Sequence, residues 1–168
     1  MRCILKAMRI LLPLLLVSVL GSSHAPPLKP VRWTLANGTG PRSVVSGRVV
    51  EVTLQAEIEK GWYIYSLTQK PGGPIPLRIQ LVGAADVGVR GAIKAPKPVT
   101  KFDPNFGIET ELHRGKPKFT FAVGVPAGSL TGKRDLQIAA RYQACSETLC
   151  LPPRTEKIGL TLRITSAR

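Results

Sequence analysis

The sequence predicts an all-β protein built as an antiparallel β-sandwich. Three observations lead to this fold class. Apolar and polar residues alternate with a period of two in several segments, and no window of about eleven residues or more keeps helical spacing. Turn formers are frequent, with 15 Pro and 16 Gly among 168 residues. Such a chain is too apolar to be disordered and too rich in turn formers for a helical bundle.

The clearest strand covers residues 50–58, where every second side chain is apolar and the others are polar. A Lys60-Gly61 turn leads from it to a second strand at residues 62–65. Further strands with the same alternation are expected at residues 77–81, 119–125, 136–142 and 158–164. Residues 94–107 are rich in proline and are predicted to be a long irregular loop, a feature that is usually functional or mobile.

Residues 1–25 have the organisation of a secretory signal peptide. Basic residues come first, an apolar run follows at residues 10–20, and small residues allow cleavage after Ser23 or Ala25. The apolar run is shorter than the roughly 20 residues that span a bilayer, although an uncleaved membrane anchor remains the alternative. We therefore expect a protein exported to the periplasm or beyond, with residues 26–168 forming a single domain.

The chain is strongly basic, with 24 Lys and Arg against 10 Asp and Glu. Such an excess would suit nucleic acid, but the basic residues are dispersed without a run or interleaved aromatics, and an exported protein rarely meets nucleic acid. An anionic membrane surface or an acidic protein partner is the better expectation, with a generally basic surface as the alternative. Two unpaired histidines leave no expected metal site.

Two cysteines remain beyond the signal peptide, Cys145 and Cys150, with four residues between them. That spacing suits a hairpin loop, in which opposed residues are close enough for a disulfide. Strand parity from Leu136 to Tyr142 places Cys145 on the face away from the core, unless a bulge intervenes. A disulfide closing so short a loop adds little stability, so a surface-facing bond here favours redox activity. A structural disulfide in a non-catalytic secreted binding domain is the alternative.

The residues around the cysteines resemble a known signature. Tyr142-Gln143-Ala144-Cys145 and Cys150-Leu151-Pro152-Pro153 are similar to the periplasmic amino-terminal (alpha) domain of the thiol:disulfide interchange protein DsbD. Three further stretches agree in order, namely residues 61–65 (Gly-Trp-Tyr-Ile-Tyr), 103–107 (Asp-Pro-Asn-Phe-Gly) and 112–115 (Leu-His-Arg-Gly). The similarity extends over about residues 44–164, nearly all of the expected mature chain.

The resemblance implies an immunoglobulin-like sandwich whose cysteine pair cycles between disulfide and dithiol without a cofactor. Such a domain takes electrons from a thioredoxin-like partner or a membrane donor and passes them to periplasmic thiol proteins, as one component of a protein-disulfide reductase. Cys145 and Cys150 match the redox pair, and the resemblance favours Cys150 as the partner-facing sulfur. The residues matching the cap that shields the pair are Phe102, Asp103, Asn105, Phe106 and Gly107. The residues expected to line the site are Tyr63, Tyr65 and Tyr142.

The sequence also departs from the family pattern. The loop between the cysteines is one residue shorter than in the best-known members. Asn105 stands where those members place the capping Phe, which leaves Phe106 or Phe102 to shield the disulfide. No membrane domain and no thioredoxin-like Cys-x-x-Cys follows in this sequence. We therefore expect a free-standing domain whose electron donor is on another chain.

Overall fold

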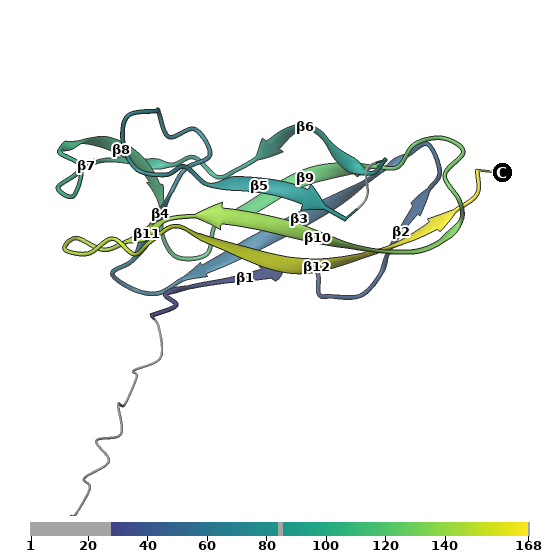
Figure 1. The fold of residues 1–168 in the computed structure, drawn as a ribbon, viewed down its shortest axis with the longest axis horizontal. Coiled ribbons are helices and arrows are strands. Elements are labelled where there is room, and N and C mark those ends of the chain that lie inside the picture. Colours follow the sequence, from purple (N-terminus) through teal and green to yellow (C-terminus); the bar gives the residue numbers. More distant parts are fainter. Residues whose placement is uncertain (1–27, 84–85, 168) are drawn as a thin grey trace, which may run out of the picture.

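The computed structural model describes residues 28–83 and 86–167, which form a β-sandwich (Figure 1). The strands in these residues are β1 (Val31–Leu35), β2 (Arg42–Val45), β3 (Val49–Ile58), β4 (Tyr63–Tyr65), β5 (Arg78–Val82), β6 (Gly88–Lys94), β7 (Val99–Asp103), β8 (Ile108–His113), β9 (Lys118–Gly124), β10 (Gly132–Tyr142), β11 (Ala144–Cys145) and β12 (Arg154–Thr165). The predicted all-β sandwich is confirmed. The expected signal peptide lies outside the described residues, and none of those residues forms a helix long and apolar enough to cross a membrane.

The strands form three four-stranded sheets, in the orders β1-β3-β9-β6, β2-β12-β10-β5 and β11-β4-β8-β7. The strand pairs are antiparallel except for β2 and β12, which run parallel. The first two sheets form the body of the sandwich, and the third lies at one end of it (Figure 1). This end sheet contains both the segment after β10 and the hairpin of β7 and β8.

The main core lies between the first two sheets and follows the predicted alternation. The alternate residues of β3 from Val52 to Ile58 are buried, and so are those of β10 from Leu136 to Tyr142. The ring of Trp33 on β1 lies 5.8 Å from that of Phe119 and 5.6 Å from that of Tyr142. The aromatic residues of three strands thus pack together within the main core.

The prediction of a long irregular loop over residues 94–107 is wrong. β6 extends to Lys94, and Val99–Asp103 forms β7, which pairs with β8 as an antiparallel hairpin. β7 is an edge strand whose first four side chains are exposed, so its sequence carries no alternation of apolar and polar residues. The nearby prolines added to the appearance of a loop, whereas backbone pairing with β8 holds the strand.

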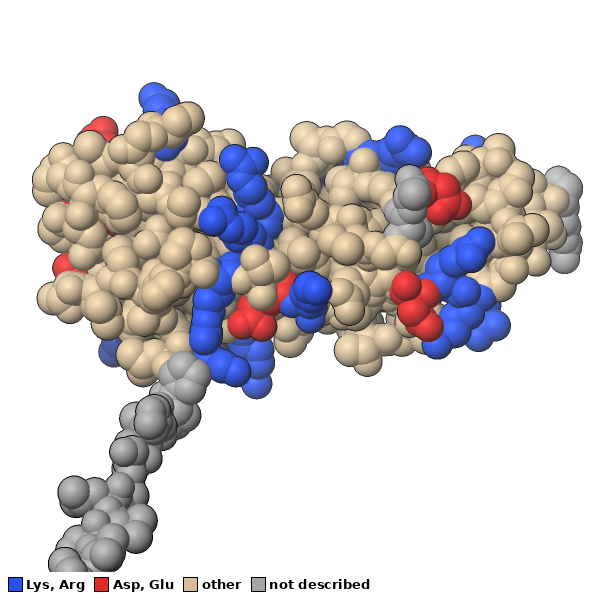
Figure 2. All heavy atoms as spheres, in the orientation of Figure 1, with Lys and Arg blue, Asp and Glu red and all other residues tan. Residues whose placement is uncertain are grey.

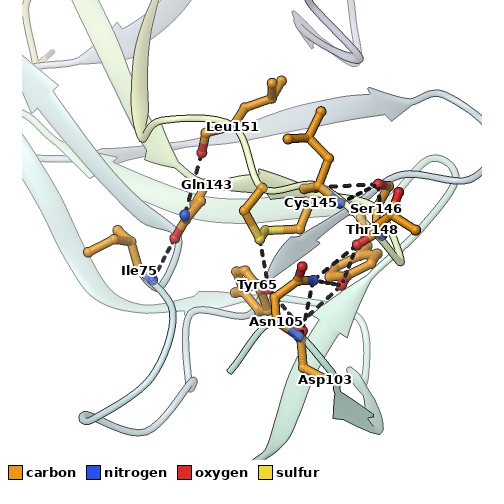
Figure 3. Close-up of a disulfide and its surroundings, with 12 residues drawn as sticks. Tyr65, Ile75, Asp103, Asn105, Gln143, Cys145, Ser146, Thr148 and Leu151 are labelled. Carbon is orange, nitrogen blue, oxygen red and sulfur yellow. Dashed lines mark hydrogen bonds between the residues drawn. A yellow bond between two sulfur atoms is a disulfide. The ribbon is translucent and has the colours of Figure 1, made fainter. Parts of the chain in front are cut away.

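The chain passes from the body of the sandwich to the end sheet at Gln143. β10 ends just before this residue, and β11 begins just after it and pairs with β4. The Gln143 side chain accepts a hydrogen bond from the backbone N–H of Ile75 at 3.2 Å and donates one to the carbonyl of Leu151 at 3.4 Å (Figure 3). It therefore anchors the segments on both sides of the cysteine hairpin.

Candidate functional site

Cys145 and Cys150 form a disulfide across a tight hairpin at the end of β11, with Cα atoms 4.1 Å apart. Two backbone hydrogen bonds close the hairpin, from Ser146 to Leu149 at 2.8 Å and from Leu151 to Ala144 at 2.9 Å. Cys145 is fully buried, whereas Cys150 is partly exposed. Of the two cysteines, Cys150 is therefore the more accessible residue.

The expectation that Cys145 faces the surface is wrong, although parity placed it on the correct side of the strand. Ala144 points into the main core, and Cys145 points to the opposite face of the end sheet. That face carries a second apolar cluster, in which Cys145 packs with Tyr63 and Tyr65 of β4 and with Leu112 of β8. Parity sets the direction of a side chain but does not show what covers it.

Asp103, at the end of β7, is buried beside the disulfide and accepts several hydrogen bonds (Figure 3). The hydroxyl of Tyr65 donates to its Oδ2 at 2.5 Å, and the hydroxyl of Tyr63 lies 3.1 Å from the same oxygen. Asn105 donates to Oδ1 from its backbone N–H at 2.9 Å and from Nδ2 at 3.0 Å. The carboxylate thereby joins the β7–β8 hairpin to β4.

These contacts determine the protonation states of the three groups. Burial by itself would raise the pKa of Asp103, but the hydrogen bonds from Tyr65, Asn105 and Tyr63 outweigh it, so the pKa lies below its usual value. Burial, followed by the hydrogen bond to Asp103, raises the pKa of Tyr65 far above normal. Burial and the Asp103 charge likewise raise the pKa of Tyr63. At neutral pH the site therefore holds one carboxylate and two hydroxyl donors.

The hydroxyl of Tyr65 also lies 4.0 Å from the sulfur of Cys150. This distance is long for a hydrogen bond, and the single proton of the hydroxyl is donated to Asp103. The hydroxyl could donate to a Cys150 thiolate, the form of cysteine that carries out exchange, only after turning away from Asp103 and approaching the sulfur.

The turn from residue 104 to residue 107, which the resemblance matches to the cap, lies against this cluster. The carbonyl of Asp103 accepts hydrogen bonds from the N–H groups of Phe106 at 3.2 Å and Gly107 at 2.8 Å, and Gly107 has a φ of 67°, which favours glycine. The ring of Phe106 packs edge to face on Tyr65, with the ring centres 6.0 Å apart. Phe106 is 37% exposed, whereas Phe102 extends from β7 and is 58% exposed. Of the two candidate cap residues, the structure brings Phe106 to the cluster.

Not every residue expected at the site lies there. Tyr142 belongs to the main core beside Trp33, and burial raises its pKa to about 12. Phe102 is exposed on β7 and does not reach the cluster. The remaining expected residues lie on adjacent elements around the disulfide, namely Tyr63, Tyr65, Asp103, Asn105, Phe106 and Gly107. Within residues 28–83 and 86–167, no three His, Cys, Asp or Glu side chains gather as metal ligands would.

The sequence did not predict a group of charged residues that lies beside the cysteine loop. Glu147, in the loop between the cysteines, forms ion pairs with Lys101 of β7 and with Arg114, which follows β8. The hydrogen bond from Lys101, and then that from Arg114, lowers the pKa of the Glu147 carboxyl. An acidic residue inside the cysteine loop of a strongly basic chain was the only signal available from the sequence.

Comparison with known proteins gives one family match. The family model described as thiol:disulfide interchange protein DsbD, N-terminal, matches residues 37–162, which include both cysteines and the cap. No curated protein sequence matches significantly.

Several solved structures resemble the fold. The N-terminal periplasmic domain of ScsB from Proteus mirabilis aligns at 19% identity with a TM-score of 0.52, covering 77% of this chain and 44% of that one. This chain thus spans less than half of the ScsB chain. The reduced N-terminal domain of DsbD from Neisseria meningitidis also aligns at 19% identity, with a TM-score of 0.46, covering 68% of this chain and 88% of that one. Together with the family match, the ScsB likeness confirms the predicted immunoglobulin-like sandwich.

We expect Asp103→Asn to destabilise the protein by about 1.5–3 kcal/mol at pH 7, because hydrogen bonds to a charged acceptor are lost and an amide N–H₂ is left facing the hydroxyls. The pKa of Asp103 is lower in the folded protein than in the unfolded chain, so its contribution is complete above the usual Asp pKa and is lost as the pH falls through the folded value. Urea unfolding between pH 7 and pH 2 should therefore show a smaller acid loss for the variant.

The matched control is Asp135→Asn, which removes an exposed carboxylate paired with Lys133. We expect this control to change stability little at pH 7. Equal losses in the two variants, or an unchanged acid profile for Asp103→Asn, would contradict the assigned role of the buried carboxylate.

We expect Phe106→Ala to speed reduction of the disulfide by dithiothreitol, because the ring that packs on Tyr65 is removed, with only a modest loss of stability. Rates of reduction and urea unfolding curves measure the two effects. Phe102→Ala is the control and should leave the rate unchanged. A core Phe would instead cost about 3–5 kcal/mol. A loss of that size with unchanged kinetics would mean that Phe106 supports the fold and does not shield the sulfur.

Proposed function

The chain belongs to the family of amino-terminal domains of the thiol:disulfide interchange protein DsbD, and we propose that its Cys145–Cys150 pair carries reducing equivalents between partner proteins. The observation that supports this most directly is the contrast between the two sulfurs. Cys145 is buried and Cys150 is partly exposed, beneath a cap that touches the site through a few side chains. This contrast supports a role for Cys150 in meeting the partner and for Cys145 in resolving the intermediate.

The exchange needs no cofactor. A partner thiolate attacks Sγ of Cys150 and forms a mixed disulfide, while the Cys145–Cys150 bond breaks and its electron pair leaves on Sγ of Cys145, which takes up a proton. A second partner thiolate then attacks the partner's own sulfur in the mixed disulfide and releases Cys150 as a thiolate. The partner becomes a disulfide and this chain a dithiol, a transfer of two electrons. The reverse steps reduce an acceptor disulfide.

Tyr65 and Asp103 assist the steps in which Cys150 is a thiolate. The Tyr65 hydroxyl lies 4.0 Å from Sγ of Cys150. Asp103 accepts its proton while the disulfide is intact, and burial, followed by this hydrogen bond, raises the pKa of Tyr65. When Cys150 becomes a thiolate, the hydroxyl turns from Asp103 and donates to it, and because the hydroxyl stays protonated it does not become a competing nucleophile.

The charge distribution supports an acidic partner. Figure 2 shows Lys and Arg side chains gathered in a band across the face of β5, β10 and β12. Arg78 lies directly opposite Arg141 in the strand register, and Lys157 lies opposite Ala139, two residues along β10. Like charges directly opposite each other repel and destabilise a sheet. An anionic partner surface bound against the band would offset this repulsion. We propose thioredoxin-like donors and periplasmic thiol proteins as the partners, and an exported location for the chain.

The proposal is tested by capture of a partner. Cys145→Ala leaves Cys150 free, and we expect it to form a mixed disulfide with an acidic thioredoxin whose single remaining active-site cysteine has been activated as a mixed disulfide with thionitrobenzoate. Non-reducing electrophoresis and mass spectrometry measure the product. Since salt screens attraction between opposite charges, capture should slow as the ionic strength rises.

Cys150→Ala is the matched control, because it leaves only the buried Cys145. We expect capture by this variant to be slower by on the order of tenfold or more, since exchange depends on access to the sulfur. If neither variant forms a mixed disulfide, the exchange function is wrong. Faster capture by Cys145 would reverse the assigned roles of the two cysteines.

A further inference from the structure

Glu147 lies in the loop between the two cysteines and connects that loop to the hairpin of β7 and β8. Its Oε1 lies 2.6 Å from Nζ of Lys101, and its Oε2 lies 2.7 Å from the same nitrogen. Nη2 of Arg114 donates to Oε1 at 2.9 Å. Lys101 is part of β7, and Arg114 directly follows β8. We call Glu147, Lys101 and Arg114 the Glu147 clasp.

A second set of contacts joins the same two segments next to the clasp. The carbonyl of Ser146 accepts a hydrogen bond from Nδ2 of Asn105 at 3.2 Å, and the hydroxyl oxygen of Tyr63 lies 3.0 Å from the same carbonyl. Figure 3 shows Asn105 reaching from the cap toward Ser146, beside Asp103 and the disulfide. The residue after Cys145 is therefore bonded to the cap, and the next residue carries the ion pairs.

Arg114 is held in place from two directions. Its guanidinium carbon lies 4.6 Å from the centre of the Tyr63 ring, a distance at which a cation and an aromatic face attract each other. The same guanidinium pairs with Glu147. Because Tyr63 is buried in the cluster around the disulfide, Arg114 ties the exposed loop between the cysteines to that buried cluster.

We propose that Glu147 is a positioning residue that fastens the cap to the cysteine hairpin, so that its pairs with Lys101 and Arg114 set how often the sulfur of Cys150 is open to attack. The resemblance predicts an aromatic residue at position 105 of the cap. The residue there is Asn105, which is polar and donates a hydrogen bond to Ser146. The inference rests on the proposed exchange function, because control of access to Cys150 matters only if the disulfide is exchanged. The clasp itself can be tested independently with a small thiol.

The clasp is weak enough to open. The side chains of Glu147, Lys101 and Arg114 are 52%, 43% and 38% exposed, and exposed ion pairs contribute little individually. Because Cys150 is only partly exposed, attack on its sulfur is faster in the open state, so the rate of reduction rises with the population of that state when opening is fast. Loss of the clasp should therefore raise the rate by only about two- to fivefold, the effect of losing one or two such pairs.

The test compares reduction of the disulfide by dithiothreitol in the wild type, Glu147→Gln and Lys101→Gln, by alkylation of the freed thiols and mass spectrometry. We expect both variants to be reduced about two- to fivefold faster, and the double variant no faster than Glu147→Gln, because removing the Glu147 charge already removes its pair with Lys101. Rising salt should speed reduction of the wild type, since it screens the pairs, and should affect the variants less.

The chain offers a matched control in Glu57 on β3, which also forms ion pairs with two cations, Arg32 and Lys116, none of these residues being in the cysteine loop or in β7. Glu57→Gln changes the net charge as Glu147→Gln does and should leave the rate unchanged. Urea unfolding midpoints identify any variant that is only destabilised. Glu147→Gln should keep the wild-type midpoint while its reduction is faster.

Glu147→Gln removes a negative charge and Lys101→Gln removes a positive one. If the local charge acted only by attracting the dithiothreitol thiolate, the two variants would change the rate of reduction in opposite directions, whereas loss of the clasp raises the rate in both. Faster reduction in Glu147→Gln together with slower reduction in Lys101→Gln would overturn the clasp, as would unchanged rates in both. A wild-type protein that never exchanges with a thioredoxin would overturn the proposed function and leave the clasp to be judged by the dithiothreitol rates alone.

Discussion

The arrangement of the site depends on the buried carboxylate of Asp103. A buried charge is costly unless it is hydrogen bonded, and this one accepts bonds from Tyr65, Tyr63 and Asn105. The same bonds fix the turn of the cap, orient the hydroxyl nearest to Cys150 and connect the β7–β8 hairpin to β4. One group therefore determines the position of the cap, the donors around the sulfur and the docking of the end sheet.

The separation of this cluster from the main core explains how a site can open without unfolding the domain. Ile64 and Ala144 face the main core, whereas Tyr63, Tyr65 and Cys145 belong to the second cluster on the opposite face of the end sheet. Residues with few buried apolar contacts open at a lower free energy than the core of a domain. The cap residues can therefore move while the body of the sandwich, centred on Trp33 and Phe119, stays intact.

The sequence was informative where local pattern determines structure. The alternation in β3 and β10 predicted those strands, and the motif around Cys145 and Cys150 identified the family. Local pattern failed at β7, whose outward side chains carry no alternation because pairing with β8, and not burial, holds it. Parity correctly grouped Tyr142 with the core residues of β10, but the resemblance added it to the site, where the structure does not place it.

Contacts between segments far apart in the chain could not be predicted from the sequence. Glu147 pairs with residues 46 and 33 positions away, and nothing near it in the chain indicates which cations the topology brings to it. The burial of Cys145 has the same origin, because its cover comes from Tyr63 and Tyr65, far earlier in the chain. Such contacts follow from the order β11-β4-β8-β7, which the alternation pattern does not contain.

The central claim is that the Cys145–Cys150 bond is exchangeable and not merely structural. Its reduction potential tests this most directly, measured by equilibrating the purified chain in dithiothreitol or glutathione redox buffers and counting the alkylated thiols by mass spectrometry. An exchangeable bond should titrate well above about −300 mV, within reach of thioredoxin-like partners. A potential below about −300 mV would identify a structural disulfide and contradict the account.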